Sequence, residues 1–129
     1  RNGLNDWITY HGRTDDPDGV LQQTDLLLWP ARSNNPWGRS ILEAMAQGVP
    51  IMSTGQYDKF VKDGQTGYLF DSWNPDDWAK TIQRMDADRS HLDALSLNSR
   101  GNVADLCNPD LYAARMMEIY DRLLDTSPP

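Results

Sequence analysis

The sequence is poor in the residues that hold disulfides and zinc. It contains one cysteine, Cys107, and two histidines, His11 and His91, among 129 residues. A single cysteine excludes a disulfide within the chain and fits a reducing compartment, so we expect a cytoplasmic location. So few thiol and imidazole groups argue against a zinc site, and we expect Cys107 to be a buried small hydrophobe near the end of a helix.

Long apolar runs are also missing. No run approaches the length of about 20 residues that a membrane-spanning helix needs, and the polar start, Arg1 to Asp6, shows no signal-peptide pattern. A strand pattern follows almost at once, so we expect the chain to be a piece of a larger protein. Its length suffices for one domain with one modest core.

Positive charge is scarce. The chain has 12 lysines and arginines against 19 aspartates and glutamates, a net charge of −7, and no basic cluster is visible. This balance disfavours a general surface for nucleic acid or for anionic membranes. We therefore expect no nucleic-acid partner.

What is present is an alternation of strand and helix patterns. The residues from Asp25 to Pro30 form an apolar run stopped by a proline, which is typical of a strand covered on both faces. Strands alternating with helices predict a parallel α/β sheet. We expect strands over residues 7–12, 25–30, 49–53 and 68–70, and helices over residues 20–24, 38–47 and 57–63.

The last part of the chain predicts helices only. Asn74 is a good N-cap before Pro75, and the acids that follow favour a helix start. We expect helices over residues 74–86 and 90–106 and a third after Pro109, which together close the sheet as a C-terminal helical layer. Residues 1–125 would form the domain, and residues 126–129 a disordered tail.

The segment from Asn34 to Ile51 is the most informative one. It predicts a loop, a helix opened by Gly38, and a strand introduced by Gly48. Glu43 lies on the helix, and Asn35 lies eight positions earlier. Free backbone N–H groups at a helix start, followed by a carboxylate, suit a ligand with both phosphate and sugar hydroxyls. In open parallel sheets such ligands bind beyond the carboxyl ends of the strands, where this loop is expected.

These pieces, in this order, resemble the C-terminal donor-binding domain of retaining GT-B glycosyltransferases of the family 4 type. The resemblance covers nearly the whole chain, although any one piece alone would be weak. It rests on six segments: Asp25 to Pro30, Ala31 to Asn35, Trp37-Gly38, Glu43-Ala44-Met45-Ala46, Gly48-Val49-Pro50-Ile51, and the Gly64-x-x-Gly67 turn. It implies a partial Rossmann-like parallel sheet that lacks the first strands of the domain.

The resemblance also implies roles for individual residues. Glu43 matches the second glutamate of the family's Glu-x7-Glu motif, which holds the ribose hydroxyls of a sugar nucleotide. Asn35 matches the first glutamate, which lies beside the transferred sugar. The other expected donor contacts are made by Trp37, Gly38 and Arg39, whose amides would face the sugar, and by Ser40 and Leu42, whose free N–H groups would meet the diphosphate.

Several of these residues have simpler interpretations. Gly38 could only start the helix, Arg39 could only cover the helix surface, and Trp37 could pack in the loop. Asn35 departs from the family pattern, because an amide can bond a sugar hydroxyl but brings no negative charge. We interpret this change as altered sugar preference or a subfamily variant rather than loss of activity.

The leading hypothesis is the donor-binding part of a retaining glycosyltransferase, which transfers a sugar from a nucleotide-sugar to a sugar or lipid-linked acceptor. The family needs no cofactor and no metal. The groups that neutralise the diphosphate and the acceptor-binding domain would belong to a missing N-terminal part, so this chain alone should be inactive. Peripheral membrane contact of the parent protein stays open.

Two other functions remain open: a non-catalytic α/β interaction module derived from such an enzyme, and a GT-B nucleotide-sugar epimerase. We also expect a bare sheet edge on the strand over residues 7–12, through which an isolated fragment would self-associate.

Overall fold

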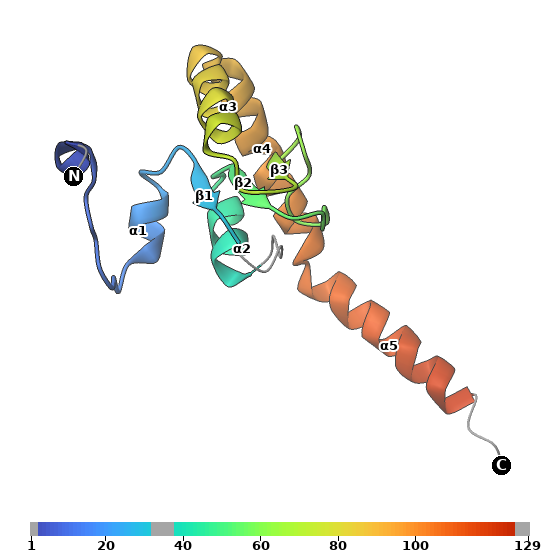
Figure 1. Ribbon diagram of the computed structural model, residues 1–129. Coiled ribbons are helices and arrows are strands. Elements are labelled where there is room, and N and C mark those ends of the chain that lie inside the picture. Colours follow the sequence, from blue (N-terminus) through green and yellow to red (C-terminus); the bar gives the residue numbers. More distant parts are fainter. Residues whose placement is uncertain (1–2, 32–37, 126–129) are drawn as a thin grey trace.

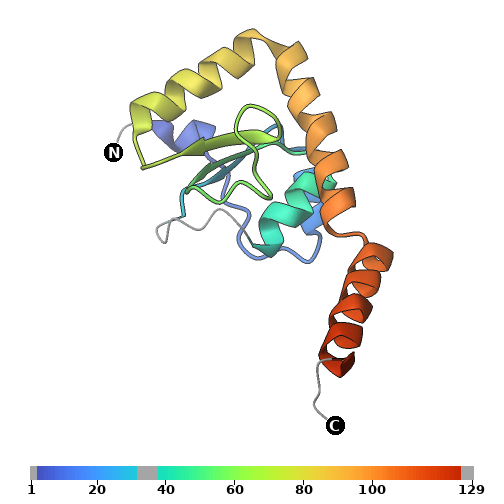
Figure 2. The same ribbon diagram turned by 90° about the vertical axis from the view of Figure 1, so that its right-hand side faces the viewer.

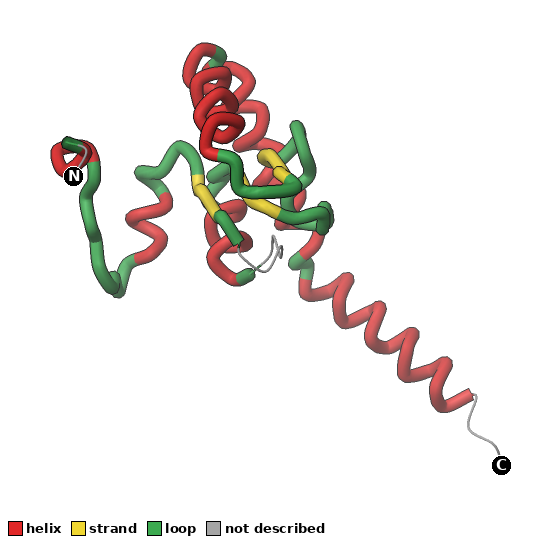
Figure 3. Tube along the Cα trace, in the orientation of Figure 1, coloured by secondary structure: helices red, strands yellow, loops and turns green. Residues whose placement is uncertain are grey.

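The structure, a computed structural model, describes residues 3–31 and 38–125. The chain forms a parallel sheet in the order β1-β2-β3 with helices on both faces (Figures 1 and 3). Its elements are η1 (Leu4–Trp7), α1 (Pro17–Leu21), β1 (Leu27–Trp29), α2 (Arg39–Ala46), β2 (Ile51–Thr54), β3 (Gly67–Phe70), α3 (Pro75–Ala87), α4 (Arg89–Leu106) and α5 (Pro109–Asp125). The predicted α/β fold with a parallel sheet is confirmed.

The central strand β2 divides the core into two clusters, because its side chains alternate between the faces of the sheet. Ile51 packs with Ile41, Ala44 and Met45 of α2 on one face. Met52 packs on the other face with residues of α3 and α4, including Trp78, Met85 and Leu95. Figure 2 shows α2 and α3 on opposite sides of the sheet, with α4 running past both.

The N-terminal segment contradicts the prediction of a strand over residues 7–12. Residues 4–7 form the 3-10 helix η1, and residues 8–12 belong to no strand. Trp7 and Tyr10 are 86% and 93% exposed. A strand needs a neighbour to receive its backbone hydrogen bonds, and the described residues provide none here. The predicted bare edge is therefore misplaced: in the part of the chain that the structure describes, β1 is the edge strand on this side of the sheet, and β2 is its one partner there.

β1 also corrects the expectation of a strand covered on both faces. Leu27 and Trp29 are half-buried against the α2 cluster, whereas Leu28 is 43% exposed on the opposite face. The helix expected over residues 20–24 begins earlier, at Pro17, because the Asp16 carboxylate accepts a hydrogen bond from the Gly19 amide.

No helix forms over residues 57–63. The carbonyls of Lys59 and Phe60, which a helix would need as acceptors, receive hydrogen bonds from the Asn102 side chain at 3.3 and 2.9 Å. The buried Thr66 hydroxyl in turn accepts from the Lys62 amide. These side chains replace the backbone bonds of a helix and give a turn.

The C-terminal helices follow the predicted bounds closely, but α5 does not close the sheet. α3 begins after Asn74, whose side chain accepts from the Asp76 amide at 3.1 Å, as expected of an N-cap. No residue of α5 is buried, and the helix projects from the body (Figures 1 and 2). Cys107, predicted to be buried, is exposed, because it follows α4 where the chain leaves the core.

Candidate functional site

The candidate site is the N-terminus of α2, beside the carboxyl end of β1. β1 ends at Trp29, and the described chain continues to Ala31 and resumes at Gly38, directly before α2. Asn35 and Trp37, two of the predicted site residues, lie outside the described residues. The other five, at positions 38, 39, 40, 42 and 43, lie together in the first turns of α2.

Gly38 is the N-cap of α2 and provides no side-chain cap. Its carbonyl accepts from the amides of Ile41 and Leu42 at 3.1 and 3.2 Å. The amides of Arg39 and Ser40 come before these first intrahelical donors, so they have no acceptor within the helix. Two amides aligned with the positive end of the helix dipole can bind an anion.

The expectation of a free Leu42 amide is wrong. This amide is the first that can reach back four residues, and it bonds to the Gly38 carbonyl. The Leu42 side chain is half-buried against the core cluster under α2. Leu42 therefore supports the helix, whereas the amide groups available to a ligand belong to Arg39 and Ser40.

Glu43, the fifth residue of α2, lies next to Arg39. The Arg39 Nε atom and the Glu43 Oε1 atom are 3.3 Å apart, with side chains 92% and 38% exposed. Such an exposed ion pair contributes little to stability. A carboxylate offers about four acceptor positions on its two oxygens, so Glu43 can accept further bonds from a ligand while Arg39 stays in contact.

α2 is held by its buried face and by a cap at its C-terminus. Ile41, Ala44 and Met45 are fully buried beneath it. At its C-terminus Gly48 has a left-handed φ of 79°, and the Val49 amide donates to the Ala44 carbonyl at 2.8 Å. This is the Schellman motif. The helix that carries Glu43 is therefore held in one position.

Two hydroxyls, which the sequence analysis did not single out, fix the end of β1. Ser53 Oγ donates to the Trp29 carbonyl at 3.1 Å, and Thr54 Oγ1 donates to the Ala31 carbonyl at 2.7 Å. Both residues are buried at the carboxyl end of β2. The signal in the sequence was a pair of hydroxyl residues that ends an otherwise apolar strand, since buried hydroxyls need partners.

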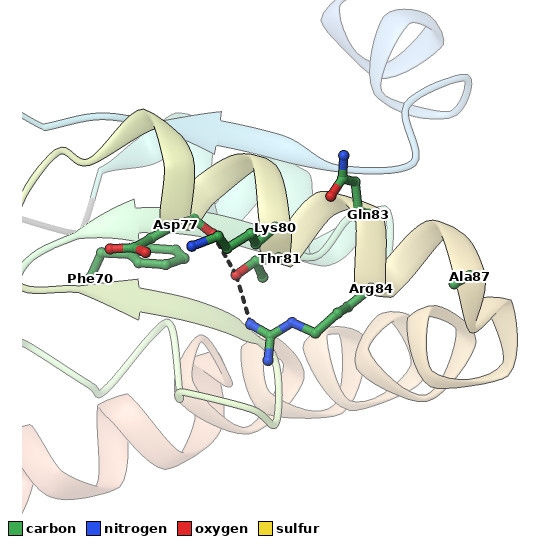
Figure 4. A pocket seen from close by; sticks show the side chains of 7 residues that line it. All are labelled: Phe70, Asp77, Lys80, Thr81, Gln83, Arg84 and Ala87. Atoms are coloured by element: carbon green, nitrogen blue, oxygen red, sulfur yellow. Dashed lines mark hydrogen bonds between the residues drawn. The ribbon is translucent and has the colours of Figure 1, made fainter.

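A separate hollow of about 690 Å³ lies along α3 and contains none of the predicted site residues. In Figure 4 the Arg84 guanidinium reaches back to Thr81, where its Nη2 atom donates to Oγ1 at 3.0 Å. Within residues 3–31 and 38–125, no group of three or more His, Cys, Asp or Glu side chains could hold a metal ion. The same residues contain no helix long and apolar enough to cross a membrane.

This fold, with a helix N-terminus facing the carboxyl edge of a parallel sheet, is the architecture of the C-terminal domain of GT-B glycosyltransferases. The chain belongs to the family described as glycosyl transferases group 1, whose model matches residues 1–102.

Three similar proteins illustrate the relationship. The D-inositol 3-phosphate glycosyltransferase of Arthrobacter sp. (strain FB24) is 31% identical over 87 residues, which cover 64% of this chain and 20% of that protein. A structure of sucrose-phosphate synthase from Thermosynechococcus elongatus has a TM-score of 0.78 at 29% identity, and the match covers 96% of this chain and 32% of the synthase chain. The structure of Anabaena HepE in complex with UDP-glucose has a TM-score of 0.76 at 21% identity, and the match covers 90% of this chain and 33% of the HepE chain. The chain thus spans a third or less of these proteins.

Proposed function

We propose that this chain is the donor-binding part of a retaining glycosyltransferase, which transfers a sugar from a nucleotide-sugar to a sugar or lipid-linked acceptor. The observation that carries the proposal is the position of Glu43. Its partly exposed carboxylate lies one turn behind the Arg39 and Ser40 amides, which have no acceptor within α2, and the helix itself is packed on the core and capped at its C-terminus. In a chain of the glycosyl transferases group 1 family, this arrangement fits the two polar parts of a nucleotide donor, the diphosphate and the ribose.

The diphosphate binds at the helix start. The Arg39 and Ser40 amides donate to phosphate oxygens, and the helix dipole favours the negative charge. Ser40 is exposed, and the Arg39 side chain is 92% exposed, so a ligand can approach both. The leaving group develops charge as the sugar departs, and donors already aimed at that charge lower the barrier.

Glu43 binds the ribose. Its carboxylate accepts hydrogen bonds from the ribose hydroxyls, and bonds to a charged acceptor are stronger than neutral ones. Arg39, in contact at 3.3 Å, keeps the carboxylate oriented. The complex of HepE with UDP-glucose supports a nucleotide-sugar as the type of donor.

Asn35 occupies the position at which the enzymes that this chain resembles have a glutamate beside the transferred sugar. In this proposal the amide binds a sugar hydroxyl and alters which sugar is preferred. Transfer proceeds with retention of the anomeric configuration and without a metal, as the resemblance implies. The chain alone supplies half of the donor site, and the longer enzyme completes it.

The proposal is tested by calorimetric titration of UDP, GDP and ADP, with and without attached sugars, into the longer enzyme. We expect one nucleotide series to bind, and we expect Glu43→Ala to weaken it by about 1–3 kcal/mol, because a charged hydrogen-bond partner is lost. Arg39→Ala should weaken binding less, which separates the loss of Glu43 from the loss of the ion pair. No binding to the unmodified enzyme would overturn the proposal and favour the interaction module.

Asp93→Ala is the matched control. It removes an exposed carboxylate from α4, so it changes the net charge by the same amount as Glu43→Ala. We expect its nucleotide affinity to equal that of the unmodified protein. An equal loss of nucleotide affinity in both variants would mean that Glu43→Ala acts only by changing the net charge of the protein.

A further inference from the structure

The hollow along α3 brings an aromatic ring, a carboxylate and two cations together. Its volume of about 690 Å³ lies in the range of about 300–1,000 Å³ that is usual for small-molecule sites. Phe70 lines it from the end of β3, and Asp77, Lys80, Thr81 and Arg84 line it from α3 (Figure 4). These four helix positions follow the spacing i, i+3, i+4, i+7, so their side chains share one side of α3. We call this place the α3 hollow.

The Arg84 side chain is held in the α3 hollow by a buried hydroxyl. Its Nη2 atom donates to Thr81 Oγ1 at 3.0 Å, and the same oxygen donates to the Asp77 carbonyl at 2.9 Å. Thr81 is only 2% exposed, so this oxygen has a fixed position. A guanidinium carries five N–H donors, and most of them remain for a ligand. Because the side chain is already ordered, a ligand that binds it loses less entropy.

The cations of the α3 hollow favour an anionic group. Lys80 and Arg84 lie four positions apart on α3, and in the part of the chain that the structure describes neither forms an ion pair. The chain has 19 acidic against 12 basic residues, so carboxylates are not in short supply. A guanidinium binds phosphate through two parallel hydrogen bonds, and an ammonium adds a second positive charge. A phosphate group therefore fits this part of the hollow.

The end of the α3 hollow nearest the start of the helix has a different chemistry. The Phe70 ring packs on the buried Trp78, with ring centroids 5.0 Å apart, so the ring is ordered. The Asp77 carboxylate accepts from the Asn74 amide at 2.8 Å, which orients it and leaves further acceptor positions on its two oxygens. An aromatic ring packs against C–H groups, and a carboxylate accepts hydrogen bonds from hydroxyls. Such a pair of side chains suits a sugar ring.

We propose that the α3 hollow binds a monosaccharide phosphate. Its phosphate contacts Arg84 and Lys80, and its sugar ring packs on Phe70 and donates hydroxyl bonds to Asp77. Asp77 precedes Arg84 by seven residues, about 10 Å of helix, which a sugar and its phosphate can span. Inorganic phosphate would leave the ring and the carboxylate without a role, and a neutral sugar would leave both cations without a partner. The proposal does not depend on the proposed donor site, because the α3 hollow shares no residue with α2.

Calorimetric titration of the longer enzyme tests the proposal. The probes are the 6-phosphates of mannose, galactose and glucose, and the comparisons are the free sugars and inorganic phosphate. We expect at least one sugar phosphate to bind at least about tenfold more tightly than its free sugar and inorganic phosphate, because bonds to charged groups are the stronger ones. No binding of any sugar phosphate would overturn the proposal. Binding no tighter than that of inorganic phosphate would also overturn it, since the hollow would then be a simple anion site.

Substitutions locate the bound sugar phosphate. We expect Arg84→Gln to weaken its binding at least about tenfold, because a charged partner of the phosphate is lost. Arg115→Gln removes the same charge from the exposed surface of α5 and should leave the affinity unchanged, as should Glu43→Ala. A loss in Glu43→Ala but not in Arg84→Gln would place the sugar phosphate at α2 and overturn the proposal, whatever the nucleotide titrations show.

The sugar end is tested by Asp77→Asn. This substitution removes a negative charge from the α3 hollow but keeps an acceptor for Asn74. We expect it to weaken binding of the sugar phosphate at least about threefold, because hydroxyl bonds to a charged acceptor are stronger. Asp76→Asn removes the same charge from an exposed residue of the first turn of α3 that does not line the hollow, and it should have no effect. Tighter binding to Asp77→Asn would mean that this carboxylate only repels the phosphate, which would contradict the proposal.

Discussion

At the scale of single residues, Gly67 is required by the distance between two strands. A Cβ atom at this position would lie 2.8 Å from the Ile51 backbone nitrogen and closer still to its carbonyl oxygen. Both atoms belong to the neighbouring strand β2, and backbone in a sheet cannot move aside as a flexible side chain can. Gly67 therefore allows β3 to approach the strand that forms the centre of the core.

We predict that Gly67→Ala destabilises the chain by about 1–3 kcal/mol, the range typical of overpacking in a core. Gly101→Ala is the control, because a Cβ atom in that position of α4 meets nothing within 4 Å. It should stabilise the chain by about 0.5–1 kcal/mol, since alanine favours a helix over glycine. Urea unfolding measures both changes. If Gly67→Ala left the free energy of unfolding unchanged, the two strands would be able to separate easily, and the explanation would be wrong.

The sequence predicted part of the candidate site at this scale. Glu43 and Arg39 could be placed because a helix pattern after Gly38 fixes their spacing. The anchoring bonds from Ser53 and Thr54 could not, since they depend on β1 and β2 being neighbours. The Leu42 amide was misjudged because counting residues from a predicted start does not show which carbonyl the first turn uses.

At the scale of elements, α4 begins at a charged cap. The Asp88 carboxylate accepts from the Ser90 hydroxyl at 2.6 Å and from the His91 amide at 3.1 Å. These hydrogen bonds, the Ser90 bond foremost, hold the pKa of Asp88 below its ordinary value of 3.8. Because the pKa is lowered in the folded chain, the charged cap stabilises the chain at pH values above the ordinary pKa. This stabilisation is lost as the pH falls through the pKa of the folded chain.

We therefore predict that Asp88→Asn lowers the Tm at about pH 7 and that the difference from the unmodified chain shrinks towards about pH 3. Asparagine can still cap a helix, so the substitution removes the charge while keeping an acceptor. Asp93→Asn, on the same helix, should leave the Tm unchanged at both pH values. A difference for Asp88→Asn that stays constant between the two pH values would contradict this explanation.

The errors at this scale share one physical cause. Strand and helix patterns describe local preferences, but residues 7–12 have no neighbouring strand among the described residues, and the carbonyls of residues 59 and 60 are bound by Asn102 of α4. Tertiary partners, or their absence, overrode the local pattern in both segments. α3, by contrast, was predicted closely because Asn74 and Pro75 mark its start without help from elsewhere in the chain.

At the scale of the whole molecule, β1 is an edge strand of the sheet, open on one side as far as the described residues go. Leu27 donates to the Pro50 carbonyl beside β2, and successive residues of a strand point their backbone groups to opposite sides. The N–H and C=O groups of Leu28 therefore face away from β2. An open edge of this kind can pair with another strand.

We predict that the 129-residue chain self-associates through this edge at high concentration and that Leu28→Lys shifts it towards monomer, since charge on an edge strand opposes pairing. Sedimentation velocity over a concentration series measures the association. As a control, Ile119→Asp places a charge on the exposed helix α5 and not on the sheet edge, so it should leave association through β1 unchanged. A chain that stays monomeric at every concentration would contradict the prediction.

The central claim, that Glu43 binds the ribose of a nucleotide donor, is tested most directly by a double-mutant cycle. The affinity of the preferred nucleotide and of its 2′-deoxy and 3′-deoxy forms is measured against the unmodified longer enzyme and against Glu43→Ala. We predict that removing a ribose hydroxyl weakens binding to the unmodified enzyme and hardly changes binding to Glu43→Ala. The coupling should be at least about 1 kcal/mol. Equal losses on both proteins would show that Glu43 does not contact the ribose.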